Sequence, residues 1–368
     1  MSLRVLFVGG FQKIGKSGHV GGQAFACTSL VESDWGKTIN WHLLDTMAET
    51  NQKRSFLYRL KKAIQRFAEM YRVLRKGEVD QVLIFSSAGF SFVEKGLMAR
   101  MAKRYHKPVM FAPRSGLILD SMENSKWMHN YVRNTISLVD RVICQGESWQ
   151  EFYQNLAGGP DEKYVVIHNW ISSDPYLANV PDLSIRQSRK EMKVLFLGWI
   201  NQNKGIFDLL DAAEMVRDLP IQFVVGGNGT HFEEVLKQIK DRKLEGKVDM
   251  RNWITGTDKM DVLRECDAFV LPSYREGYPN APLEAMASGL PVIVSAISSL
   301  PDLITDGVNG YLFEPGDAGK MASIFTELAQ HPEKRLQVGK AGRERVLTNN
   351  SLENATTHLQ RMFSDLTK

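Results

Sequence analysis

Short apolar runs alternate with helical patterns over the first 170 residues of the chain. Between these runs, apolar residues recur at three- and four-residue spacing, which predicts helices over 22–32, 91–106, 124–139 and 148–156. The runs that we expect to be strands are LRVLFVG, TINWHLL, QVLIFSS, PVMFA, DRVICQ and YVVIHN. Strands that alternate with helices of crossover length predict a parallel sheet covered on both faces.

The same alternation starts again after residue 190. Residues 173–190 are polar, contain Pro175 and Pro181 and lack a long apolar periodicity, so we expect a linker there. The strands KVLFLG, IQFVVGG, VDMRNW, AFVLPS and PVIVSA then alternate with expected helices over 206–217, 232–244, 259–265 and 282–288.

This pattern predicts an α/β protein with two Rossmann-like domains. The first domain covers residues 1–172 and the second covers residues 191–348. We expect residues 349–368 to form a C-terminal helix that packs back on the N-terminal domain. Open parallel sheets bind ligands at the carboxyl ends of their strands, so we expect the active site in a central cleft between the domains.

Composition indicates an ordinary globular protein, with 43% hydrophobic and 24% charged residues. No apolar run approaches the roughly 18 to 20 residues that cross a bilayer, and the N-terminus lacks an export pattern, so we expect a cytosolic protein. The three cysteines, Cys27, Cys144 and Cys266, are far apart and form no C-x-x-C pair. We therefore expect neither disulfides nor a zinc site.

Positive charge is concentrated in one segment. The net charge is +4, but the segment from Lys53 to Lys76 holds nine basic residues and one acid, which gives +8 and leaves −4 elsewhere. Two interpretations stay open: a core-facing helix with a solvated outer face, or a patch that binds an anionic membrane surface near the acceptor. Nucleic acid is not expected, because no recognition motif accompanies the charge. The apolar residues of the segment form one helical stripe: Phe56, Leu57, Leu60, Ile64, Phe67, Tyr71 and Leu74.

The loop after the first strand contains a phosphate-binding pattern. Residues Gly10 to Ser17 match G-x-x-x-x-G-K-[ST], the loop that binds a nucleoside triphosphate when a helix starts at its Lys-Ser step. Further glycines follow Ser17, up to the pair Gly21-Gly22. Each glycine within a helix lowers the stability of the helix by about 1 kcal/mol relative to alanine, so we expect the helix to begin near Gln23. A triphosphate loop stays an alternative hypothesis, which requires Asp45 as the acidic residue at the end of a neighbouring strand.

The most informative stretch is SYREGYPNAPLEAMASGLPVI, which begins at Ser273. The expected strand AFVLPS is followed by a loop and then by a helix, and Pro282 suits the first turn of that helix. Glu276 in the loop and Glu284 in the helix are eight positions apart. Two carboxylates therefore accompany one helix N-terminus. Carboxylates accept sugar or ribose hydroxyls, and the free N–H groups of the helix suit a diphosphate.

This stretch resembles the E-x₇-E region of the retaining nucleotide-sugar glycosyltransferases with the GT-B fold, specifically glycosyltransferase family 4. The segment from Gly198 to Gly205 resembles the family's strand-G-R-L-x-x-x-K-G segment. The turn VVGGNG, the segment WITG and the N-terminal Gly21-Gly22 pair also match family features. The resemblance spans nearly the whole chain and implies the GT-B fold with a retaining transfer.

The resemblance also implies a role for each matching residue. Glu276 is expected to bind the transferred sugar, Glu284 the ribose, and Lys204 the diphosphate leaving group. The base is expected near Trp253 and Ile254. The full donor-binding set that the resemblance implies is Gly21, Gly22, Gly198, Lys204, Trp253, Ile254, Glu276, Gly277, Tyr278, Pro279, Asn280, Leu283 and Glu284.

Two departures from the family pattern affect the charge and the chemistry. Trp199 stands where the family has arginine, and Lys13, Lys16 or Arg114 is expected to supply the missing charge, with Arg114 counted among the catalytic residues. The segment 113–116 lacks the histidine found in many members, and His19 in the glycine loop is not assigned a catalytic role. No D-x-D occurs, so we expect no metal and no other cofactor.

We therefore expect a metal-independent retaining glycosyltransferase that uses a UDP- or GDP-linked sugar and a glycan or lipid-linked acceptor. The acceptor hydroxyl attacks on the face that the diphosphate leaves, and a phosphate oxygen takes its proton. The expected setting is surface polysaccharide or glycolipid synthesis, in the cytosol or on the inner face of the membrane. Alternatives are a P-loop ATPase or GTPase that uses residues 10–17, and a non-catalytic protein that binds sugar nucleotides.

Overall fold

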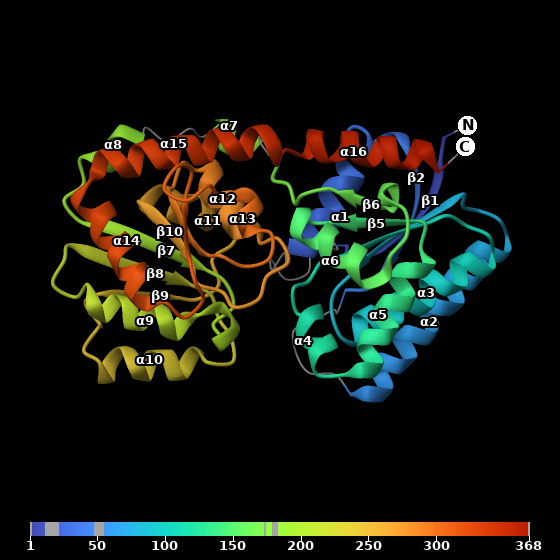
Figure 1. Ribbon diagram of the computed structural model, residues 1–368, viewed down its shortest axis with the longest axis horizontal. Coiled ribbons are helices and arrows are strands. Elements are labelled where there is room, and N and C mark those ends of the chain that lie inside the picture. The colour runs from blue at the N-terminus through green and yellow to red at the C-terminus, as the bar shows by residue number, and fades with distance from the viewer. Residues whose placement is uncertain (1, 12–21, 48–54, 173, 179–182, 367–368) are drawn as a thin grey trace. The chain divides into compact units, whose positions relative to one another are not determined.

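The chain folds into two compact units of parallel sheet and helix. The computed structural model describes residues 2–11, 22–47, 55–172, 174–178 and 183–366. Unit 1 comprises Met1–Asn169 together with Leu352–Lys368, and unit 2 comprises Trp170–Ser351. In the described part of the chain each unit contains one six-stranded sheet, and all strand pairs are parallel (Figure 1). The predicted fold class is confirmed.

The sheet of unit 1 has the strand order β2-β1-β3-β4-β5-β6. Its central strands β3 and β4 are buried apolar runs, which is typical of a parallel sheet with helices on both faces. The strands are β1 (Arg4–Gly9), β2 (Asn40–Asp45), β3 (Gln81–Ser86), β4 (Val109–Pro113), β5 (Arg141–Cys144) and β6 (Tyr164–Val166). The helices are α1 (Gly22–Glu32), α2 (Phe56–Arg75), α3 (Phe90–Arg104), α4 (Ile118–Glu123), α5 (Lys126–Leu138), α6 (Glu147–Ala157) and α16 (Leu352–Asp365), with 3-10 turns at Gly36–Thr38 and Asp161–Lys163.

The last helix of the chain belongs to unit 1, where α16 lies alongside α1 (Figure 1). Phe363 of α16 is 2% exposed, and its ring lies edge-on to that of Trp35 at 5.3 Å. Its backbone carbonyl accepts a hydrogen bond of 3.0 Å from the side chain of Gln81, the first residue of β3. The core of unit 1 is therefore closed by residues from both ends of the sequence.

Helix α2 buries only part of the apolar stripe that the sequence shows. Leu74 is buried, whereas Leu57, Leu60 and Ile64 are 74%, 45% and 59% exposed. Ser55 caps the helix by accepting a hydrogen bond from the backbone N–H of Tyr58. The apolar stripe of this helix therefore faces the core only in part. No helix of the described residues has both the length and the apolar character needed to cross a bilayer.

The sheet of unit 2 has the strand order β12-β11-β10-β7-β8-β9. The strands are β7 (Met192–Leu197), β8 (Ile221–Gly226), β9 (Val248–Arg251), β10 (Ala268–Leu271), β11 (Val292–Ser295) and β12 (Tyr311–Phe313). The chain builds outward from β7 to β9 on one side, then returns to place β10 on the other side of β7. This reversal between β7 and β10 is the topological switch point, where open α/β sheets bind ligands.

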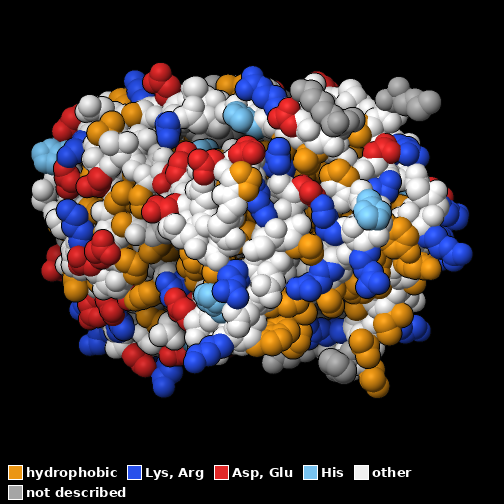
Figure 2. Space-filling view, turned by 45° about the vertical axis from the view of Figure 1, so that its right-hand side comes forward, with side chains coloured by type: hydrophobic (Ala, Val, Ile, Leu, Met, Phe, Trp, Pro, Cys, Tyr) orange, Lys and Arg blue, Asp and Glu red, His pale blue; other side chains and the backbone are white. Residues whose placement is uncertain are grey.

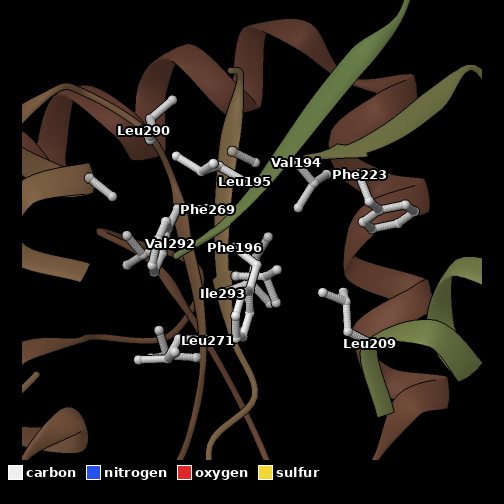
Figure 3. Close-up of a cluster of buried hydrophobic side chains, with 14 of the residues drawn as sticks. Val194, Leu195, Phe196, Leu209, Phe223, Phe269, Leu271, Leu290, Val292 and Ile293 are labelled. Atoms are coloured by element: carbon white, nitrogen blue, oxygen red, sulfur yellow. The ribbon is translucent and has the colours of Figure 1, made fainter. Parts of the chain in front are cut away.

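Helices flank this sheet, and its strands supply a tightly packed core. Phe196, Phe269 and Ile293, from neighbouring strands, are fully buried and lie together in Figure 3. The helices are α7 (Asp174–Ala178), α8 (Leu183–Gln187), α9 (Ile206–Met215), α10 (Phe232–Asp241), α11 (Gly256–Glu265), α12 (Asn280–Ala287), α13 (Leu300–Leu303), α14 (Ala318–Gln330) and α15 (Pro332–Asn349), with a 3-10 turn at Gln202–Lys204.

The segment that we expected to be a linker contains the short helices α7 and α8 and forms part of unit 2. Arg186 of α8 is 6% exposed, and its guanidinium donates to the backbone carbonyls of Leu263 and Ser288, both at 2.9 Å. A buried guanidinium needs such acceptors, because unpaired donors lose their hydration without replacement. These bonds fix α8 to the body of unit 2.

Candidate active site

A partly buried ion pair lies at the switch point of unit 2. Lys204 follows β7 and Glu276 follows β10, and the Lys204 Nζ donates to Glu276 Oε1 at 2.5 Å. The hydroxyl of Ser273 donates to the same carboxylate oxygen at 2.7 Å. Glu276 is only 8% exposed, so its charge depends on these donors rather than on bulk water. The structure thus brings together the two residues predicted to hold the sugar and the diphosphate.

Backbone contacts hold the two loops of this pair against each other. The N–H of Tyr274 donates to the carbonyl of Asn203 at 2.8 Å. Gly205 has φ of 68°, and a Cβ atom added to it would lie 1.9 Å from the carbonyl oxygen of Pro272. Only glycine accepts both this left-handed conformation and this close approach. Lys204 is therefore positioned by the glycine that follows it.

Helix α12 begins directly after this loop and carries the second predicted glutamate. Pro282 lies in its first turn, and Gly289, with φ of 74°, follows its end. The carboxylate of Glu284 accepts a hydrogen bond of 2.7 Å from Nζ of Lys259 on α11. The N-terminus of α12 is thus accompanied by two carboxylate–ammonium pairs. The positive end of the helix dipole at this N-terminus suits an anionic group.

The sequence pattern gave no signal for Lys259 or Ser273. Lys259 reaches Glu284 from a different helix, 25 residues earlier in the chain. The sequence pattern places Ser273 at the start of the loop and indicates no contact with Glu276. Contacts of this kind depend on how separate elements pack, and one sequence without its fold does not contain that information.

The loops after β7, β8 and β9 pack together beside this site. A Cβ atom at Gly226 would lie 2.6 Å from the side chain of Ile254, and one at Gly227 would lie 1.9 Å from the carbonyl oxygen of Gly198. The rings of Trp199 and Trp253 meet edge-on at 4.8 Å. Trp253 and Ile254, the residues predicted to lie near the base, therefore lie against Trp199 and Gly226 respectively. Trp199 is 49% exposed there, in place of the arginine that the resemblance leads one to expect.

Two members of the predicted donor set contribute their side chains to the core instead. Leu283 is fully buried, and Tyr278 is 5% exposed with its hydroxyl accepting a hydrogen bond from Asn350 at 3.0 Å. Leu283 and Tyr278 can therefore contact a ligand only through their backbone groups. Gly277, Pro279 and Asn280 lie between these elements, in the loop and at the first residue of α12.

Arg114 lies in unit 1, after β4, whereas the pairs described above lie in unit 2. Its guanidinium donates to Oδ1 of Asn169 and lies 4.6 Å from the ring centroid of Phe85. Burial lowers the pKa of Arg114 to about 10, so the group keeps its charge at pH 7. The structure does not bring Arg114 together with Lys204 within one unit.

The residues of the glycine loop are mostly outside the described part of the chain. This applies to Lys13, Lys16, His19 and Gly21, whereas Gly22 is the exposed first residue of α1. Asp45, which the triphosphate-loop hypothesis requires, accepts hydrogen bonds from the backbone of Phe11 at 3.1 Å and Met47 at 2.9 Å. The carboxylate of Asp45 thus accepts hydrogen bonds from backbone N–H groups of neighbouring loops. Among the described residues, no group of three or more His, Cys, Asp or Glu is arranged to hold a metal ion.

Comparison with known sequences identifies a glycosyl transferase domain in unit 2. The family model described as Glycosyl transferases group 1 matches residues 184–345. The amylovoran biosynthesis glycosyltransferase AmsK of Erwinia amylovora is 29% identical over 200 residues, which cover 52% of this chain and 48% of that protein. The chain therefore aligns with about half the length of this relative.

Two solved structures share the fold over essentially the whole chain. Sucrose-phosphate synthase from Thermosynechococcus elongatus has a TM-score of 0.80 at 18% identity and covers 99% of both chains. Anabaena Alr3699/HepE in complex with UDP and glucose has a TM-score of 0.72 at 19% identity and covers 100% of both chains. The expected GT-B fold is confirmed. The chain is an enzyme of the glycosyltransferase class, and the matches do not support the P-loop alternative.

Substitution of Gly205 tests whether backbone contact positions the ion pair. Gly256→Ala is a matched control, because Gly256 has φ of 60° and nothing within 4 Å of an added Cβ atom. We expect the control to lose about 1 kcal/mol from its backbone conformation alone. Gly205→Ala is expected to have a lower melting temperature than the control, because it also displaces Pro272. Equal melting temperatures for the two variants would show that the contact has no energetic role.

Proposed function

We propose that this glycosyltransferase moves a sugar from a nucleoside diphospho-sugar to a hydroxyl of a glycan or lipid-linked acceptor, with retention of configuration and without a divalent metal. The observation that carries the proposal is the contact between Lys204 and Glu276 at the switch point of unit 2. A cation and a carboxylate at the N-terminus of a helix are the groups that a diphosphate and sugar hydroxyls require.

The proposed chemistry assigns one task to each group. Glu276 accepts hydrogen bonds from the hydroxyls of the transferred sugar, and Glu284 accepts those of the ribose. Lys204 and the N–H groups of α12 stabilise the charge that develops on the diphosphate as its bond to the anomeric carbon breaks. The acceptor oxygen forms the new bond on the same face, and a phosphate oxygen takes the acceptor proton. The protein then acts chiefly by positioning and fixed charge.

Lys204 and the end of a helix supply the positive charge that a metal would otherwise bring. Lys204 is 22% exposed in its side chain, so water screens its charge only in part. Arg114 is our candidate for the cation that Trp199 replaces, because its guanidinium keeps its charge at pH 7. In this proposal unit 1 provides the acceptor side of the reaction.

The known relatives suggest the donor and the biological setting. HepE was solved in complex with UDP, and AmsK is named for amylovoran biosynthesis. By analogy we propose a UDP-linked donor, with a GDP-linked donor as the alternative, and a role in surface polysaccharide or glycolipid synthesis. A non-catalytic sugar-nucleotide-binding role is the second candidate, which turnover measurements distinguish.

A nucleotide panel tests the donor class and the role of metal. UDP or GDP is expected to raise the melting temperature of the protein by the same amount with EDTA and with magnesium, because the charges that bind the diphosphate belong to the protein. Stabilisation by ATP or GTP that needs magnesium would instead support a triphosphate site and contradict the proposal.

Removal of Glu276 separates binding from turnover. Glu276→Ala is expected to lower kcat by at least about a hundredfold, because the sugar loses a fixed partner in the transition state. UDP affinity is expected to stay equal or to rise, because Lys204 no longer shares its charge with the carboxylate. Glu234→Ala, at an exposed position of α10, is the control and should leave both values unchanged. Normal turnover in Glu276→Ala would refute the assignment of the sugar site.

We also propose that the exposed face of α2 binds an anionic membrane surface, on the cytosolic side. Leu57, Leu60 and Ile64 are exposed within the basic segment, and Phe90 at the start of α3 is 78% exposed. Arg59 lies 5.9 Å from the ring centroid of Phe90, so the two helices form one mixed surface. Figure 2 shows hydrophobic and basic side chains intermixed on its right-hand side. Apolar side chains among basic residues are what an interfacial segment requires.

Vesicle binding tests this surface. The double variant Leu60→Ser/Ile64→Ser is expected to bind vesicles that contain anionic lipid about thirtyfold more weakly than the unaltered protein, because two apolar contacts of roughly 1 kcal/mol each are lost. Leu236→Ser is the matched control, since Leu236 is 39% exposed on α10 of unit 2. Equal binding to neutral and anionic vesicles, or no binding at all, would contradict the proposal.

A further inference from the structure

Lys259 is the partner of Glu284, and neither the sequence pattern nor the comparisons assign it a role. It lies in the first half of α11, six positions after Trp253, which precedes the helix. Its Nζ donates to Oε1 of Glu284 at 2.7 Å, with the two side chains 30% and 19% exposed. The bond therefore links the helix after the expected base-binding loop to the helix that carries the expected ribose-binding carboxylate.

This bond fixes the carboxylate of Glu284. The backbone carbonyl of Glu284 accepts hydrogen bonds from Ser288, which hold the helix but not the side chain. Within the described residues, Lys259 is the side chain that donates to the carboxylate. The side chain of a glutamate has three rotatable bonds, and holding it in one orientation before the ligand arrives reduces the entropy lost on binding.

The bond also leaves one carboxylate oxygen available. Lys259 contacts Oε1 only, so Oε2 can accept a hydroxyl. Burial and the charge of Glu284 raise the pKa of Tyr176. Among the described residues, the carboxylate of Glu284 has one side-chain donor, the ammonium group of Lys259. Without that ammonium group, the carboxylate would be free to turn away toward water.

We propose that Lys259 is a positioning residue, which holds Glu284 so that its second oxygen faces the ribose hydroxyls of the donor. The inference rests on the proposed function, because it takes Glu284 as the ribose-binding residue. Lys259 then contributes to the affinity for ribonucleotides through Glu284, and it does not contact the diphosphate.

The test compares two nucleotides that differ only in the ribose. We would measure the dissociation constants of UDP and 2′,3′-dideoxy-UDP by calorimetry, or of the guanosine pair if the panel selects GDP. In Lys259→Met, UDP affinity is expected to fall about tenfold, because one carboxylate loses its fixed orientation. The affinity for the dideoxy analogue is expected to stay unchanged. Lys259→Arg retains a donor and should recover most of the preference for ribose, and the exposed Lys237→Met is the control.

Each outcome bears on one of the two proposals. Equal losses of affinity for both nucleotides in Lys259→Met would overturn the inference, because they indicate a charge effect on the diphosphate or a general defect. Glu284→Ala separates this failure from that of the proposed function. If Glu284→Ala retains the preference for ribose, the assignment of Glu284 is wrong. If it loses the preference while Lys259→Met retains it, only the role of Lys259 is wrong.

Discussion

A carboxylate that is nearly removed from water must have charged or hydrogen-bonding partners, and Glu276 imposes this constraint on unit 2. Its partners are Lys204, 72 residues earlier in the chain, and Ser273 in its own loop. Breaking such a pair leaves a buried charge without compensation. The loops after β7 and β10 are consequently held together at the edge of the sheet where a ligand can reach them. The close approach of Gly205 to Pro272 is part of the same arrangement.

The charges around α12 suit a ligand that is itself negative. Two glutamates and two lysines balance one another, so the site carries little net charge from its side chains, and the N-terminus of the helix adds a partial positive charge. In the proposed function, a diphosphate contacts Lys204 and the helix end, while sugar and ribose hydroxyls bind the carboxylates. The ion pairs that hold these elements together without a ligand would then also include the groups that bind the donor.

Much of the fold was predictable, because the strands of a parallel sheet are continuous apolar runs bounded by turn residues. The placement of Glu276 and Glu284 around one helix N-terminus was predictable, because the two residues lie close together in sequence. The pairing of Glu284 with Lys259 was not, because it depends on the packing of two helices. The helix α8 was missed because five residues show no periodicity, and Arg186 acquires its importance only by insertion among backbone carbonyls. The apolar stripe of α2 has the same sequence pattern whether the stripe is buried or exposed, so the sequence did not predict the exposure of Leu57, Leu60 and Ile64.

The return of α16 to unit 1 has a consequence for synthesis of the chain. Unit 1 lacks Phe363 and its contacts with Trp35 and Gln81 until residues 352–365 have left the ribosome. Unit 2 is continuous in sequence and has all of its strands well before that point. The N-terminal sheet is translated first but would be the later of the two to reach its final form. Until α16 is synthesised, the residues of unit 1 that α16 covers would stay exposed to solvent and to chaperones.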